Sequence, residues 1–214
     1  MRLSLMLALP ILGCAPAATA QTEVPAAPFR SVTLGDGGHV VIRHGSAQQV
    51  TLVEGDADIR VEGTRLRIPK CRDCARRSRL TVEIVTPVLD AVALDDGGRL
   101  TLAGDFPRQA QLAAAVSNGG AIDVRPLAAD RVTASVAQGG MIFARPIQRL
   151  VAAVSHGGAI TYWGEPVVQS AIDHGGVVQR GRAADSDRPL ADMSPHPLAP
   201  PPIPPVPPVS PVGN

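Results

Sequence analysis

The sequence predicts an all-β fold, a single-domain β-solenoid in which short strands are joined by Gly-Gly turns about every 18–22 residues. Hydrophobic residues make up 45% of the chain but aromatic residues only 2%. The core is therefore expected to consist of Val, Ile, Leu and Ala, and β-branched side chains favour strands. Gly-Gly pairs also recur at a nearly constant spacing, with apolar residues at fixed offsets from each pair. A period of this size is typical of stacked repeats.

Residues 1–20 are expected to be a signal peptide. Arg2 supplies the positive start, Leu3 to Leu12 the short apolar run, and Ala18-Thr19-Ala20 a small-residue cleavage site. A second route fits too, because Ile11-Leu12-Gly13-Cys14 resembles a lipoprotein box in which Cys14 is lipidated. Either route predicts export to the periplasm, or to the outer membrane and cell surface, of a Gram-negative bacterium. Membrane contact is expected only through a lipid anchor on Cys14.

Proline-rich segments flank the predicted domain on both sides. Residues 21–28 form a short Ala/Pro linker, and residues 183–214 form a tail in which proline dominates from Pro189 onward. Proline has no backbone N–H, so such a run favours an extended, solvated chain. We therefore expect one folded domain over residues 29–182 and a disordered tail.

The repeats are defined by Gly-Gly pairs at 37–38, 97–98, 119–120, 139–140, 157–158 and 175–176. Apolar or small residues recur seven, five and three positions before the first Gly of the last four pairs, and three positions after it. They are Leu112, Val132, Leu150 and Val168; Ala114, Ala134, Ala152 and Ser170; Val116, Val136, Val154 and Ile172; and Ile122, Ile142, Ile160 and Val178. Positions two apart face the same side of a strand, and equal offsets stack in columns.

A hairpin meander is the alternative fold, because Asn118-Gly119 is a good hairpin turn signal. Hairpins would not, however, require the same residue class at the same offset in successive units. Pro126, Pro146 and Pro166 mark a second bend at the opposite end of several repeats, where a strand stops donating hydrogen bonds.

The repeated pattern of apolar residues around each Gly-Gly pair resembles the head GIN domain family of putative auto-transporter adhesins. It is carried by Val116-Ser117-Asn118-Gly119-Gly120-Ala121-Ile122 and by the equivalent segments 136–142, 154–160 and 172–177. The resemblance covers roughly Phe29 to Arg182. It implies a β-solenoid and export, and it supplies no catalytic residue. One departure is the second Gly, which stands where family members often have Ser or Asn.

Cys71 and Cys74 have the spacing of a redox or zinc motif. No helical pattern lies beside them to lower a thiol pKa, and a zinc site would need two further ligands. In an oxidising compartment we expect a disulfide between Cys71 and Cys74 that closes a loop.

His156 and His174 share one offset, so stacking would bring the two imidazoles together. They could share a metal with Asp173 or belong to a ladder of polar turn residues with Asn118 and Gln138. We expect no metal and no cofactor.

The outward columns supply the candidate binding surface. Arg125, Arg145 and Trp163 share one offset, and Phe143 lies on the neighbouring outward column. Exposed aromatic rings beside guanidinium groups suit sugars or anionic polymers. Alternatively, Trp163 only shields the edge of the last repeats. The outward positions of the other sheet are small and uncharged, which suits packing against a partner or a second copy.

The chemistry of the sequence argues against an enzyme. The paired acids Asp95 and Asp96 lie in a turn whose neighbours offer Asn118 or Gln138 instead of a partner acid, whereas glycosidases need two carboxyl groups. A net charge of +1 gives no attraction to nucleic acid. We therefore expect a non-catalytic, exported, adhesin-like contact protein of the envelope. The alternatives are a polysaccharide-binding module using the four outward residues, or a structural or assembly spacer. Its partner would be an envelope polysaccharide, another envelope protein or a second copy.

Overall fold

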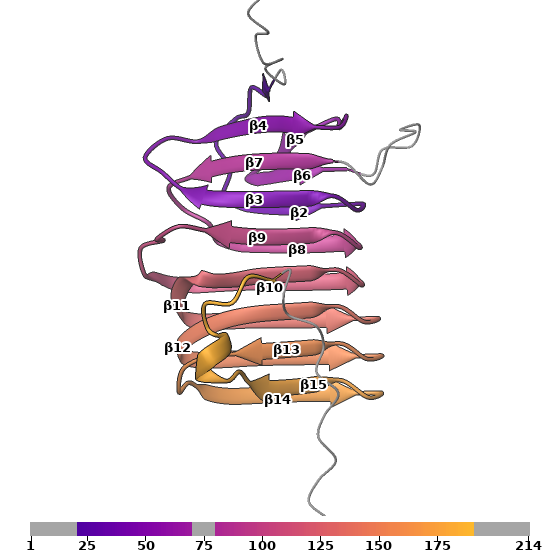
Figure 1. The fold of residues 1–214 in the computed structure, drawn as a ribbon, viewed down its shortest axis with the longest axis vertical. Coiled ribbons are helices and arrows are strands. Elements are labelled where there is room, and N and C mark those ends of the chain that lie inside the picture. The colour runs from indigo at the N-terminus through magenta and orange to yellow at the C-terminus, as the bar shows by residue number, and fades with distance from the viewer. Residues whose placement is uncertain (1–20, 70–79, 191–214) are drawn as a thin grey trace, which may run out of the picture.

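Residues 21–69 and 80–190 are described by the computed structural model, and they form an all-β protein (Figure 1). This confirms the predicted class. The described ranges include a three-residue 3-10 helix, η2 (Ala183–Asp185), and no helix in them is long and apolar enough to cross a membrane. The signal peptide, Cys14, Cys71, Cys74 and residues 191–214 lie outside the described residues, and the expectations about them stay predictions.

The strands follow one another closely along the chain. In the N-terminal part they are β1 (Thr22–Glu23), β2 (Ser31–Leu34), β3 (His39–His44), β4 (Gln49–Glu54), β5 (Arg60–Glu62), β6 (Arg65–Ile68), β7 (Thr81–Thr86), β8 (Ala91–Asp96) and β9 (Arg99–Ala103). In the C-terminal part they are β10 (Gln109–Asn118), β11 (Ala121–Ala137), β12 (Met141–Ser155), β13 (Ala159–Tyr162), β14 (Val167–Asp173) and β15 (Val177–Arg180).

Hydrogen bonds join the described strands into one curled sheet. Its main path runs β1-β4-β7-β3-β9-β11-β10-β8-β2-β6-β5, so the sheet folds back on itself at the long strand β11. The result is two columns of strands, seen one behind the other in Figure 1. The first column holds β4, β7, β3, β9, the starts of β11 and β12, and then β13 and β15. The second holds β6, β2, β8, β10, the ends of β11 and β12, and then β14.

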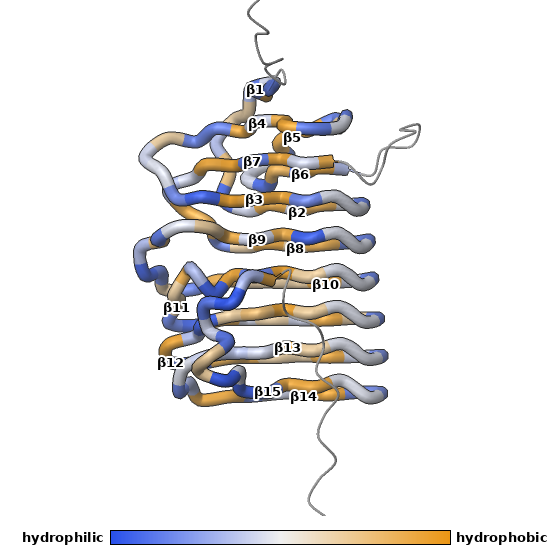
Figure 2. Tube along the Cα trace, in the orientation of Figure 1, coloured by the Kyte–Doolittle hydropathy of each residue, from blue (hydrophilic) through white to orange (hydrophobic). Residues whose placement is uncertain are grey.

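Successive repeats pair in parallel and in register. Val116 lies opposite Val136, which lies opposite Val154, and that residue lies opposite Ile172. In the other column Ile122, Ile142, Ile160 and Val178 pair in the same way. The columns expected from equal offsets are therefore confirmed. Figure 2 shows hydrophobic and hydrophilic residues alternating along the strands, and the inward set forms one continuous core.

The second glycine of each turn is needed for stacking. Gly120 has a φ of 88°, and a Cβ there would lie 2.8 Å from the Gly98 carbonyl oxygen and 2.9 Å from the Gly97 carbonyl carbon. Gly119 also has a positive φ, 73°, but a Cβ there would meet nothing within 4 Å. Only glycine lets the backbone of one turn rest directly on the backbone of the previous turn.

The first repeats are closed by antiparallel strands that the Gly-Gly period did not predict. β4 pairs antiparallel with β7, β1 with β4, and β5 with β6. Gln48 lies just before β4, and its side chain accepts a hydrogen bond from the Phe29 N–H at 3.0 Å and donates one to the buried Thr86 hydroxyl at 3.0 Å. This amide ties the start of the domain to the end of β7.

Residues 183–190 differ from the disordered tail that was expected to begin at position 183. They cross back over the first column, in front of β12 and β13 in Figure 1, and the Leu190 side chain is buried. We call residues 183–190 the strap. The ordered part of the chain therefore extends past Arg182 to at least Leu190.

Candidate functional site

A buried ion pair on β11 forms the centre of the candidate site. Asp123 and Arg125 are two residues apart and face the same side of the strand, where each side chain is 6% exposed. The Arg125 Nε donates to Asp123 Oδ1 at 2.8 Å, and its Nη2 donates to Asp123 Oδ2. Two parallel hydrogen bonds of this kind fix the plane of the guanidinium.

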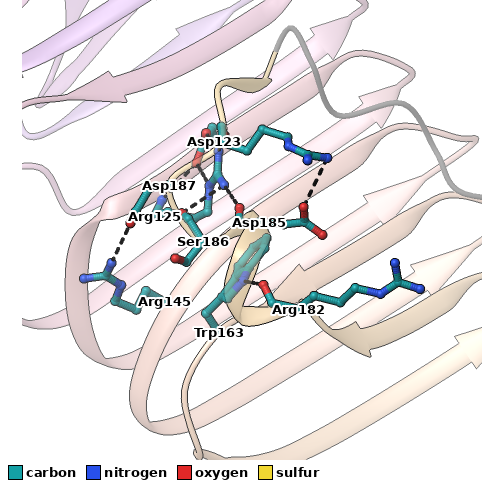
Figure 3. A network of polar contacts seen from close by, with 9 residues as sticks. Asp123, Arg125, Arg145, Trp163, Arg182, Asp185, Ser186 and Asp187 are labelled. Carbon is teal, nitrogen blue, oxygen red and sulfur yellow. Dashed lines mark hydrogen bonds and ion pairs between the residues drawn. The ribbon is translucent and has the colours of Figure 1, made fainter.

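The remaining Arg125 donors hold the strap (Figure 3). Nη1 donates to the carbonyl oxygens of Asp185 at 2.8 Å and Ser186 at 3.0 Å, and Nη2 donates to that of Arg188 at 2.6 Å. The acceptors on the strap are backbone atoms. The path of the strap therefore depends little on the identity of its side chains.

Aromatic rings complete the surface beneath the strap. Phe143 on β12 and Trp163 after β13 have ring centroids 6.2 Å apart, and the Arg125 guanidinium lies 5.7 Å and 5.1 Å from the two centroids. The Trp163 indole N–H donates to the Arg182 carbonyl at 2.9 Å. With Ala121 and Leu190 these rings form a second apolar cluster, separate from the main core.

A groove of about 560 Å³ lies where the strap meets strands β3 and β9. His39 and Arg99 are paired in register along its wall, and Thr101, Asp105 and Arg188 also line it. The pKa of His39 is lowered, first by burial and then by the positive charge of Arg99. The groove thus offers a guanidinium, a hydroxyl and carboxylates on neighbouring elements.

The family described as "Putative auto-transporter adhesin, head GIN domain" matches residues 28–143, which is more than half of the chain. The chain belongs to this family. None of the curated proteins matches the sequence.

Several solved structures are similar to the head GIN domain described here. A putative adhesin from Bacteroides fragilis is 16% identical, covers 75% of this chain and 95% of its own, and has a TM-score of 0.48. One from Parabacteroides merdae is 11% identical, with 76% and 96% covered and a TM-score of 0.36. A putative lipid binding protein from Parabacteroides distasonis is 13% identical, with the same coverage and a TM-score of 0.29.

The four residues predicted to form an exposed binding surface of the head GIN domain are brought together, but three of them are covered. Arg125 and Phe143 are 5% exposed and Trp163 is 6% exposed, because the strap lies on them. Arg145 keeps an exposed side chain, 4.0 Å from Asp187. The open aromatic platform expected from the sequence is therefore absent from the described structure, whereas the groove beside the strap is open to solvent.

Sequence reasoning missed the strap because its only large apolar residue is Leu190. A usable signal was nevertheless present on the strands. Phe143 and Trp163 are large aromatic side chains at outward offsets, and apolar groups of that size are usually covered in a folded protein. The groove residues gave no such signal, since His39 and Arg99 belong to repeats 60 positions apart.

His156 and His174 stack as the repeat predicted. Their ring centroids are 4.9 Å apart with an interplanar angle of 7°, and the His174 Nδ1 lies 2.8 Å from an Asp173 carboxylate oxygen. Gln138, His156 and His174 all adopt a positive φ just before a Gly-Gly pair. This shared backbone conformation fits a ladder of turn residues. Within the described ranges no group of three or more His, Cys, Asp or Glu side chains is arranged to hold a metal.

The acidic turn beside Gly97 likewise matches the ladder interpretation. The Asn118 side-chain amide donates to an Asp96 carboxylate oxygen at 2.8 Å. The neighbouring repeat thus contributes an amide at the position where a two-carboxylate mechanism would need a second acid.

Proposed function

We propose that this chain is a non-catalytic, exported contact protein of the bacterial envelope, and that its two strand columns form a β-solenoid which presents the groove beside the strap to an envelope polysaccharide. Membership of a family described as a putative adhesin supports a role in contact. The observation that carries the proposal is the groove itself, which lies beside the strap that Arg125 holds.

The groove suits a hydroxyl-rich chain better than an apolar one. Arg99 and Thr101 supply donors on one strand, while Asp105 and Asp187 supply carboxylate acceptors from two other segments. Sugar hydroxyls both donate and accept, so they can use groups of both kinds. Because Phe143 and Trp163 lie under the strap, the proposed recognition depends on hydrogen bonds and not on stacking against those rings.

Residues on both sides of the groove are held in place. Hydrogen bonds from Arg125 fix the strap side, and in-register pairing of β3 with β9 fixes the other side. A groove that is formed before binding loses little conformational entropy when a ligand enters. This rigidity favours a contact role for the site.

The proposal is tested by co-sedimentation of the mature protein with peptidoglycan sacculi and with lipopolysaccharide vesicles. Saturable binding to one of these fractions is expected. If the protein stays in the supernatant with both, the polysaccharide-binding role fails and a structural or assembly spacer becomes the better interpretation.

The non-catalytic part of the proposal has its own test. After prolonged incubation of the protein with the bound fraction, the amount of soluble reducing ends should equal that of a protein-free control. A protein-dependent release that rises with time would show that the chain cleaves its ligand.

A further inference from the structure

The two ends of the strand stack differ in how their edges are protected. At the N-terminal end the outermost strands are β1 and β5, which have only two and three residues. β5 is also charged, since Arg60 and Glu62 form an ion pair at 2.9 Å and Glu62 pairs with Arg67 at 3.0 Å. Short edges with charged side chains are the usual way to prevent pairing with another chain.

The C-terminal end is less protected, although Arg180 at the end of β15 pairs with Glu165 at 3.2 Å. β14 has seven residues and β15 has four, and within the described ranges β14 pairs with β12 alone and β15 with β13 alone. From Val167 to Ile172 strand β14 carries no charge and no proline. Each strand therefore presents one complete free edge to solvent.

The backbone groups of that free edge can be assigned on β15. Val177 and Gly181 donate their N–H groups to the carbonyl oxygens of Gly158 and Tyr162 in the preceding repeat. Because backbone groups alternate along a strand, those of Val178 and Arg180 point away from the stack. They are ready to accept another strand.

Apolar side chains accompany these free backbone groups. Ile172 occupies the offset at which Val116, Val136 and Val154 are each 2% exposed, yet Ile172 itself is 49% exposed. Val168, at another inward offset of the same strand, is only partly buried, whereas its partner Leu150 in the preceding repeat is fully buried. In this structure the last repeat therefore leaves core-type residues open to water.

The chain's other segments are poor candidates to cover this end. The strap is engaged on Arg125 and the aromatic rings. Residues 191–214 contain proline at least once in every three positions from Pro195 to Pro211, and proline cannot donate the hydrogen bonds of a strand ladder. The segment 70–79 joins β6 to β7, which belong to the opposite half of the stack.

We infer that the β14–β15 end is the interface between two copies of this chain, joined end to end about a twofold axis. A second copy supplies two free strands of matching length and matching apolar character. A twofold axis perpendicular to the stack would pair the edges antiparallel, and each copy would use the same residues on the other. The protected N-terminal ends would then face outward, so the assembly would stop at a dimer and not grow into a fibre.

The test is sedimentation equilibrium of the full mature chain over a wide concentration range, combined with small-angle X-ray scattering. The wild type should be a dimer whose longest dimension is close to twice that of the monomer. Ile172→Lys places a charge at the paired edge and should weaken the dimer by ~10-fold or more. Val168→Glu, at another inward offset of the same strand, should do the same.

Ala171→Lys is the matched control, because Ala171 is an exposed residue of the same strand that points to the outward face. It should leave the dimer intact, and thermal melts of all three variants should show that each is folded. A wild type that stays monomeric at every concentration would overturn the inference. A dimer that is not elongated would also overturn it, as would a dimer that Ala171→Lys breaks while Ile172→Lys does not. Both results would indicate that the copies pack through the outward faces of the strand columns.

Discussion

The two glycines of one turn should respond very differently to the same substitution. Gly119→Ala and Gly120→Ala each add one methyl group to a residue with a positive φ. At Gly119 the methyl group would point into open space, whereas at Gly120 it would lie 2.8 Å and 2.9 Å from two backbone atoms of the preceding turn. Comparing the two variants therefore separates the cost of backbone strain from the cost of crowding between successive turns.

The expected magnitudes follow from those two surroundings. A left-handed conformation costs a non-glycine residue ~1–2 kcal/mol, so Gly119→Ala should lower the free energy of unfolding by about that amount. Gly120→Ala bears the same cost and adds overpacking against backbone, which is worth a further ~1–3 kcal/mol. The preceding turn cannot easily move away, because the Ala121 N–H donates to the Gly98 carbonyl at 3.0 Å.

Urea denaturation followed by circular dichroism measures both effects. We expect Gly120→Ala to have the lower midpoint, with Gly119→Ala between it and the wild type. Gly139→Ala and Gly140→Ala repeat the comparison in the next turn, where a Cβ at Gly139 would meet nothing within 4 Å and one at Gly140 would lie 2.6 Å from the Val116 Cγ1 atom. If the two alanines of a turn were equally destabilising, the close approach of successive turns would not be the reason for the second glycine.

Three further results are expected. Leu190→Ser should loosen the strap and speed trypsin cleavage in its vicinity, measured by mass spectrometry; an unchanged rate would mean that Leu190 does not anchor it. Arg125→Met should cost ~3–5 kcal/mol in urea denaturation, because it leaves the buried Asp123 without its partner; a loss below ~1 kcal/mol would contradict the role assigned to the pair. The lowered pKa of His39 means that the native state binds fewer protons than the unfolded state. Its contribution to stability should therefore be present above about pH 6.5 and be lost as the pH falls toward the lowered pKa, and His39→Gln should remove that part of the pH dependence; an identical pH profile would refute it.

The strand columns could be predicted because their information is local and repeated. Each inward residue, such as Val136, lies at a fixed distance in sequence from a Gly-Gly pair, and the register of the strands preserves that distance. The antiparallel strands β4 and β5 could not be found in this way, because no Gly-Gly pair occurs between Gly38 and Gly97.

The candidate site was predicted in composition but not in accessibility. The shared offset of Arg125 and Trp163 placed them on one outward face correctly. What covers that face depends on the strap, which is held through its backbone carbonyl oxygens and needs few distinctive side chains. The groove in turn depends on the position of the strap relative to His39. That position cannot be predicted from the repeat period of the sequence.

The proposed contact role is tested most directly by isothermal titration of the envelope polysaccharide into two single variants, Arg99→Gln and Arg131→Gln. Arg99 lines the groove, whereas Arg131 is another exposed arginine on the second column, away from the groove. Loss of a charge-assisted hydrogen bond should weaken binding ~10-fold or more for Arg99→Gln, while Arg131→Gln should bind like the wild type. Equal affinities for the two variants would contradict the assignment of the groove as the binding site.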